Sequence, residues 1–199
     1  MTWLVRCVEL DVLDGLHHGD RFDVSTEVVG WRRVWARRRS EFRTGEDRRI
    51  NALAVIDWVL MGDRGAPVRV PAEIERIFGG PDVGTFTPAR VVVGRPGAGT
   101  QRLAHTVRHR DVDPLAHVNN ATYLDLIEEA LREGGHGDAM TVEPRRYRIE
   151  YVLPAELGER VEGQVWPDGQ GWAYRLSNTD HAELVRARLE TDPTAWIGG

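Results

Sequence analysis

The feature that most constrains this chain is a strand-rich unit that occurs twice. In the first half, residues 8–12 (VELDV) precede residues 19–23 (GDRFD). In the second half, residues 149–152 (IEYV) precede residues 158–162 (GERVE). Each half then has a Gly-Trp pair that opens an arginine-bearing strand, at Gly30-Trp31 and at Gly171-Trp172. Two copies of one strand-rich unit predict two similar sheets in one chain.

The elements expected around these landmarks give an α+β class of fold. Alternating apolar and polar residues predict strands over residues 3–11, 21–29, 31–42, 49–61, 101–108, 144–153, 160–166, 171–178 and 182–190. Residues 71–78 predict a short helix with proline at its start. One long helix is expected only in the second half, where apolar residues recur at helical spacing up to Gly134: Tyr123, Leu124, Ile127, Ala130 and Leu131. A curved antiparallel sheet wrapped around this central helix buries both faces of the helix.

The Gly- and Pro-rich residues 80–100 are predicted to be a linker between the two units. The first unit is therefore placed at residues 1–79 and the second at residues 101–199. The first unit is expected to lack a long helix of its own, so the concave face of its sheet needs another cover. A partner chain is the expected cover.

Composition excludes several kinds of chemistry. All 26 basic residues are arginine, which removes lysine-based catalysis and the phosphate-loop lysine. None of the three serines lies in a Gly-x-Ser-x-Gly elbow, and no Gly-x-Gly-x-x-Gly opens a helix. The single Cys7 excludes an internal disulfide and a cysteine-based zinc site, and is expected in the core of a cytoplasmic protein. A net charge of −5 and the lack of a long apolar run argue against nucleic-acid binding and a membrane span.

The chemistry that remains is concentrated in residues 108–130. Asp111 and Asp113 are followed by Pro114 and His117, and then by the expected helix start at Asn119 or Asn120. Either asparagine is a good N-cap. The free N–H groups and the dipole of a helix N-terminus favour developing negative charge, as on a carbonyl under attack.

The same stretch resembles the signature of hotdog-fold acyl thioesterases. The matching pattern is D-x-D-x-x-x-H-V-N-N-x-x-Y-L, followed by paired acids at Glu128 and Glu129. Over nearly the whole chain, the order of elements resembles the acyl-ACP thioesterases of plants and bacteria, which have two hotdog units in tandem and the catalytic signature in the second. This resemblance implies a tandem double hotdog fold with no metal and no cofactor. Family members usually have a strand and a long helix before the segment equivalent to Trp3, so either the start was placed late or the first unit lacks its helix.

The resemblance implies roles for three residues. Asp113 matches the acid that acts as nucleophile or general base, and the open alternative is a helix-capping acid. His117 matches the signature histidine that orients water or a carboxylate, and the alternative is a histidine bonded to the loop backbone. Glu150 matches a glutamate implied in activating water, although its strand can also point it outward.

Other positions depart from the family pattern or have a plainer interpretation. Leu115 stands where the plant enzymes have an asparagine, and Tyr151 where that family often has cysteine, so thiol catalysis is excluded there. Asp111 is expected to be structural or solvent-facing, and Glu129 to lie on a solvated helix face. Backbone N–H groups near Asn119 and Asn120 are the expected oxyanion donors.

The densest positive charge of the chain consists of Arg32, Arg33, Arg37, Arg38 and Arg39. A solvated sheet edge and a docking surface for acyl carrier protein both account for it. Together these features predict hydrolysis of a fatty acyl thioester, carried by acyl carrier protein or CoA, by a homo-oligomer. The alternatives are a hotdog dehydratase or hydratase and a non-catalytic acyl-binding or assembly protein.

Overall fold

The computed structural model describes residues 1–45, 48–79, 83–114 and 116–192 of the chain. It divides into two compact units, Met1–Arg90 and Val91–Gly199. The boundary lies inside the predicted linker, and residues 80–82 of that linker lie outside the described residues. Within the described part of the chain, no helix is long and apolar enough to cross a membrane.

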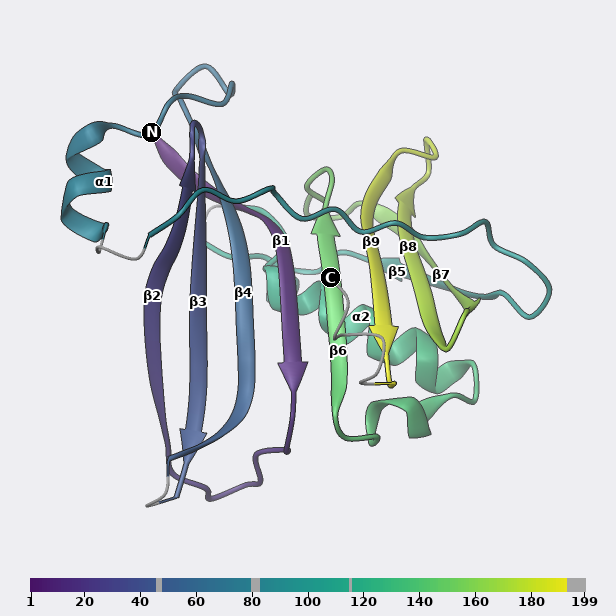
Figure 1. Cartoon of the computed structure of the whole chain (residues 1–199). Helices are drawn as coiled ribbons and strands as arrows, with labels where there is room; N and C mark the ends of the chain where they lie inside the picture. Colours follow the sequence, from purple (N-terminus) through teal and green to yellow (C-terminus); the bar gives the residue numbers. More distant parts are fainter. Residues whose placement is uncertain (46–47, 80–82, 115, 193–199) are drawn as a thin grey trace. The chain divides into compact units, whose positions relative to one another are not determined.

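Unit 1 contains four antiparallel strands in the order β2-β3-β4-β1 (Figure 1). Their bounds are Thr2–Val12 for β1, Phe22–Arg32 for β2, Trp35–Thr44 for β3 and Arg49–Met61 for β4. A short helix, α1, follows at Ala72–Phe78, as the sequence predicts. None of the residues of α1, all of which the structure describes, is buried.

The third predicted strand begins later than expected. Trp31 belongs to the end of β2, and a two-residue turn at Arg33 and Val34 joins Arg32 to Trp35. Arg33 has φ 54°, a left-handed conformation that closes such a turn but that strand patterns do not reveal. Gly30 does not end β2, because the strand passes it at a shift of register. A Cβ at Gly30 would meet Phe86 Cδ1 at 2.6 Å, so any other residue at this position would have to displace the Phe86 ring.

Unit 2 contains five antiparallel strands in the order β6-β9-β8-β7-β5. Their bounds are Gln101–Thr106 for β5, Arg145–Tyr151 for β6, Arg160–Asp168 for β7, Gly171–Asn178 for β8 and Glu183–Glu190 for β9. Two 3-10 turns lie at His109–Asp111 and Gly137–Met140.

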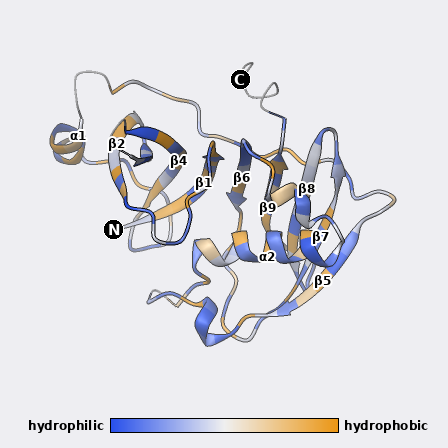
Figure 2. Ribbon diagram, turned by 90° about the horizontal axis from the view of Figure 1, so that it is seen from below, coloured by the Kyte–Doolittle hydropathy of each residue, from blue (hydrophilic) through white to orange (hydrophobic). Residues whose placement is uncertain are grey.

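The long helix α2, Asn120–Glu133, lies against one face of this second sheet (Figure 1). It buries one stripe of residues at helical spacing: Tyr123, Leu126, Ile127, Ala130 and Leu131. Figure 2 shows hydrophobic and hydrophilic residues on the same helix, as expected of an element with one face in the core. The segment that begins at Val91 passes over the strands on the other side, where Val91 contacts Glu150 of β6 and Gly94 contacts Asp168 of β7.

Candidate functional site

The loop between β5 and α2 is held in shape by its own backbone. Val112 and Val118 form an isolated bridge, and the Asp113 N–H donates to the His117 carbonyl at 2.8 Å. Helix α2 then begins at Asn120, directly after its N-cap residue. The Asn119 side chain accepts from the Ala121 N–H at 2.9 Å, so Asn119 is the N-cap of α2.

Asp113 and His117 are brought together in this loop. Oδ1 of Asp113 accepts from the His117 N–H at 3.4 Å, and the side chain of Asp113 is half-buried while His117 is exposed. The Asp113 carboxylate therefore lies next to the His117 backbone, a few residues before the N-terminus of α2. Leu115, where the family has asparagine, lies outside the described residues.

One of the two expected oxyanion donors is already used. The Asn119 N–H donates to the Asp111 carbonyl at 2.8 Å, and the Asn119 side chain serves the cap. Of the two expected oxyanion donors, the Asn120 N–H is therefore the one that remains a candidate.

Asp111 is neither solvent-facing nor loosely held. Its relative exposure is 6%, and its Oδ2 accepts from the Arg108 N–H at 2.8 Å and lies 3.0 Å from His105 Nε2. Burial alone would raise the pKa of Asp111, but the hydrogen bonds from the Arg108 N–H and the His105 ring lower it below the ordinary value. His105 and Asp111 also border an apolar space under α2 that is too narrow for a water molecule. Sequence reasoning did not single out His105, although an imidazole at the end of a strand six residues before a motif acid was a usable signal.

Glu150 lies on the face of β6 away from α2. Tyr147 and Tyr151, on the opposite face, donate to Glu128 at 2.7 Å and to the Asn120 carbonyl at 3.1 Å, which places their face toward the helix. Glu150 itself is 2% exposed, accepts from the Val91 N–H at 3.0 Å and lies 3.8 Å from Arg186 Nε. The structure therefore separates Glu150 from the loop of Asp113 and His117 by the thickness of a strand.

The face of β6 toward α2 has a polar pair of its own. Burial, together with Glu128, which accepts the hydroxyl hydrogen bond, raises the pKa of Tyr147 to about 12. The Tyr147 hydroxyl also accepts from Arg145 Nε at 3.3 Å. Glu129, next in the helix, is exposed, as its predicted place on a solvated face requires.

The five arginines singled out in the sequence do not share one surface. Arg37 donates to both oxygens of Asp57 at 2.7 and 2.9 Å, and these bonds raise the pKa of Arg37. Arg39 pairs with Glu27 at 2.8 Å and with Glu41 at 3.2 Å. Arg38 lies on the opposite face of β3 and borders an apolar pocket.

Arg32 ends β2 and Arg33 begins the turn, and Arg32 Nη1 donates to the Phe86 carbonyl at 3.2 Å. The docking hypothesis therefore depends chiefly on these two exposed side chains, and it stays a prediction.

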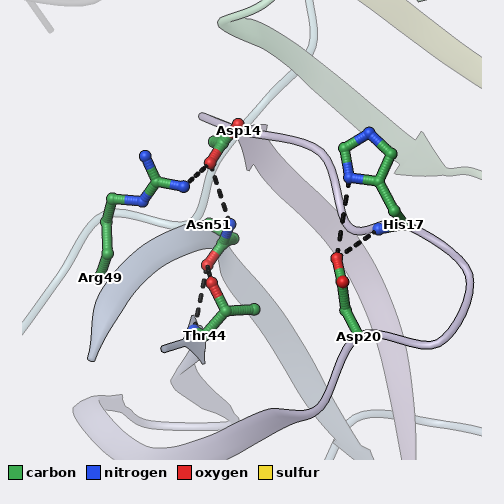
Figure 3. Close-up of polar contacts among 6 residues, drawn as sticks. All are labelled: Asp14, His17, Asp20, Thr44, Arg49 and Asn51. Carbon is green, nitrogen blue, oxygen red and sulfur yellow. Dashed lines mark hydrogen bonds and ion pairs between the residues drawn. The ribbon is translucent and has the colours of Figure 1, made fainter. Parts of the chain in front are cut away.

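The described residues of unit 1 line a polar and an apolar pocket. The polar pocket, of about 350 Å³, is lined by a network of side chains that hydrogen-bond to one another (Figure 3). Asp14 accepts from Arg49 and Asn51, and Asn51 Oδ1 accepts from the Thr44 N–H at 3.1 Å and hydroxyl at 2.6 Å. This network ties the loop after β1 to the start of β4. Across the part of the chain that the structure describes, no three His, Cys, Asp or Glu side chains are grouped to hold a metal ion.

The apolar pocket of unit 1, of about 290 Å³, lies between the sheet and α1. Three tryptophans line it: Trp3, Trp31 and Trp58. The indole nitrogens of Trp31 and Trp58 are buried without a hydrogen-bond partner among the described residues. The pocket therefore lies on the face of the sheet to which Trp58 points, and Asp57 points to the opposite face.

Comparison with protein families gives one match, and it lies in the second unit. The family model described as the acyl-ACP thioesterase C-terminal domain matches residues 96–190. A search of curated proteins finds no match. Among solved structures, an acyl-ACP thioesterase from Bacteroides thetaiotaomicron is 15% identical with a TM-score of 0.76, over 96% of this chain and 76% of that one.

Two other solved structures bear on the fold. A 12:0-ACP thioesterase from Umbellularia californica is 19% identical with a TM-score of 0.75, over 95% of this chain and 74% of that one. A MaoC-like dehydratase from Phytophthora capsici is 12% identical with a TM-score of 0.61, over 96% of this chain and 72% of that one. At these identities the likeness establishes a shared fold and leaves the reaction to the site.

Proposed function

We propose that the chain is a thioester hydrolase of the acyl-ACP thioesterase family, whose C-terminal domain model matches residues 96–190, and that its substrate is a fatty acyl thioester of acyl carrier protein. The products are the free fatty acid and the carrier thiol. The observation that carries this proposal is the Asp113 carboxylate, held beside the His117 backbone just before the N-terminus of α2.

In the proposed reaction, Asp113 is the general base. It takes a proton from a water molecule, whose oxygen attacks the thioester carbonyl carbon. Negative charge then develops on the carbonyl oxygen, near the Asn120 N–H and the positive end of the α2 dipole, and both lower its energy. The carbon–sulfur bond breaks, the acid is released, and the thiolate takes up the proton. His117 helps to orient the attacking water.

Glu150 has no step in this mechanism. Its predicted role in activating water stays a prediction, and its contacts with Val91 and Arg186 support a structural role instead. A buried carboxylate needs such partners whether or not it takes part in catalysis.

We further propose that the two units are tandem hotdog units and that unit 1 is the non-catalytic one. The sequence repeat, the antiparallel sheet in each unit and the helix under the second sheet support this. A homo-oligomer, as the sequence suggests, stays a prediction.

The test is a thiol-release assay with acyl carrier protein and CoA thioesters of several chain lengths. Asp113→Asn keeps the shape of the side chain and removes the base, so kcat should fall by about 10²–10⁴. The matched control is Asp125→Asn, an exposed acid of α2, which should leave kcat unchanged.

Three outcomes would contradict the proposal. Full activity in Asp113→Asn would remove the assigned base. Hydration of an enoyl thioester without thiol release would favour a dehydratase or hydratase. Binding of acyl thioesters without either reaction would favour an acyl-binding protein.

A further inference from the structure

The loop that carries Asp113 is anchored by the buried Asp111. Through its backbone, the Asp111 carbonyl accepts from the Asn119 N–H at 2.8 Å, and the Thr122 hydroxyl lies 3.5 Å from the same oxygen. Through its side chain, Oδ2 accepts from the Arg108 N–H at 2.8 Å. One residue therefore joins the first turn of α2 to the chain that leaves β5.

The orientation of this anchor depends on His105. The Asp111 carboxylate is buried in a space without room for water, so its hydrogen bonds must come from the protein. Within the described contacts, the one side chain in hydrogen-bond range of it is His105, whose Nε2 lies 3.0 Å from Oδ2. Arg110 Nε is 3.7 Å from Oδ1 and its side chain is 74% exposed, so it holds the carboxylate only weakly.

His105 is itself fixed by regular structure. It lies in β5, where it pairs with Val161 of β7, and its side chain is 16% exposed. A ring fixed on a strand can transmit that position to the loop, because the Asp111 side chain and carbonyl belong to one residue held at both ends. Asp113 follows two residues later, inside the Val112–Val118 bridge.

We propose that His105 is a positioning residue for hydrolysis. By donating from Nε2 to Asp111, it sets where the N-terminus of α2 and the Asp113 carboxylate stand relative to each other. The proposal rests on the proposed function for its catalytic consequence, because neither His105 nor Asp111 is assigned contact with substrate. Small displacements of a base from its reacting partner are costly in rate, while binding elsewhere on the substrate is unaffected.

A matched pair of substitutions isolates the hydrogen bond. In His105→Gln, the amide nitrogen stands the same number of bonds from Cβ as Nε2, so the donor is retained. In His105→Asn, the donor is one bond too short to reach Asp111. The control is His109→Asn, which replaces an exposed histidine in the 3-10 turn that contains Asp111.

In full-length protein, His105→Asn should lower kcat about tenfold to a hundredfold with KM within about twofold, and His105→Gln should recover most of the rate. Amide hydrogen exchange gives a second readout. The Arg108 and Asn119 N–H groups should exchange faster in His105→Asn and remain protected in His105→Gln, while amides of β8 and β9 stay as in the wild type.

Equal kcat and equal exchange in the wild type and His105→Asn would overturn the inference. Loss of protection throughout β8 and β9 in both His105 variants would also overturn it, because His105 would then support the whole unit. A wild-type protein without thiol release would refute the proposed hydrolysis alone. In that case, the exchange at Asn119 still decides whether His105 holds the loop.

Discussion

Asp57 of unit 1 and Glu150 of unit 2 are strand carboxylates buried under a segment of chain that belongs to no strand, but the two are held differently. In unit 1, Asp57 accepts from Arg37 at 2.7 and 2.9 Å and from the Ala89 N–H at 2.7 Å. In unit 2, Glu150 accepts from the Val91 N–H at 3.0 Å, and Arg186 Nε is 3.8 Å away. Both acids are 2% exposed.

The shared arrangement shows that an acid facing the interior of a sheet protein is not by itself evidence of catalysis. A backbone N–H buried over a sheet must find an acceptor, and a strand acid supplies one. An arginine on the neighbouring strand then balances the charge. Asp57 has this role in the unit without the signature, so Glu150 can have it as well.

The two units differ most on the opposite face of each sheet. In unit 2 that face packs against α2, which buries five side chains including Ile127. In unit 1 the short α1 buries none of its described residues, and the tryptophan-lined pocket remains. The helix in the second unit both completes a core and presents its N-terminus to the loop of Asp113.

The largest change in stability is expected when the two buried acids, Asp57 and Glu150, are substituted. Asp57→Asn should lower the free energy of unfolding by about 3–5 kcal/mol, because it leaves Arg37 without its bidentate partner. Glu150→Gln should cost about 1 kcal/mol, since glutamine still accepts from Val91 and the contact with Arg186 is long. Chemical denaturation of both variants measures the difference. Equal losses would mean that the closer ion pair adds nothing to stability.

The two helices give the second comparison. Ile127→Ala in α2 removes a side chain that is 2% exposed and should cost about 2–5 kcal/mol through the cavity it leaves. Ile77→Ala in α1 removes one that is 70% exposed and should change stability by less than about 0.5 kcal/mol. Urea midpoints would check both. A large loss in Ile77→Ala would show that α1 is packed in solution.

The smallest expected effect is a pH dependence that belongs to unit 2, which contains all four tyrosines. The pKa of Tyr147 is about 12 in the folded chain, against an ordinary value of 10.0. The folded state thus binds the proton more tightly, so this contribution is complete below pH 10 and is lost as the pH rises toward 12.

Over that window, Tyr147→Phe should remove roughly 1–2 kcal/mol of the decline in unfolding free energy. Burial also raises the pKa of Tyr123 and Tyr174, so spectroscopic titration of tyrosinate should show several late-titrating tyrosines, and the component near pH 12 should disappear in the variant. If that component is unchanged in Tyr147→Phe, the late titration does not belong to Tyr147.

Much of the fold could be predicted because strands and helices leave periodic patterns in a sequence. Every strand that the structure describes was expected, and β4 and β8 have the bounds that their patterns indicate. The predicted start of the third strand at Trp31 was wrong for a local reason. The left-handed turn at Arg33 is made by residue types that also occur in strands. The cap of α2 was predictable to within one residue, and only the geometry chose Asn119.

The candidate site was less accessible to prediction. The alternation of side chains along a strand predicts that Glu150 and Tyr151 point to opposite faces of the sheet, but it does not predict which of them faces the helix. That choice depends on which side of the sheet α2 packs against, and it separates Glu150 from Asp113. The contact of His105 with Asp111 was missed because it depends on how the chain turns between β5 and the loop, which no periodic pattern encodes.

The sequence by itself therefore determined the elements, their repetition and the stretch that resembles the thioesterase signature, because each depends on the local order of residue types. Only the tertiary structure decided which polar groups meet. It used the Asn119 N–H in a loop contact, buried Asp111 beside His105 and placed Glu150 under Val91. Hydrogen bonds and burial depend on neighbours that are distant along the chain, and their partners are chosen only when the sheet and helix pack.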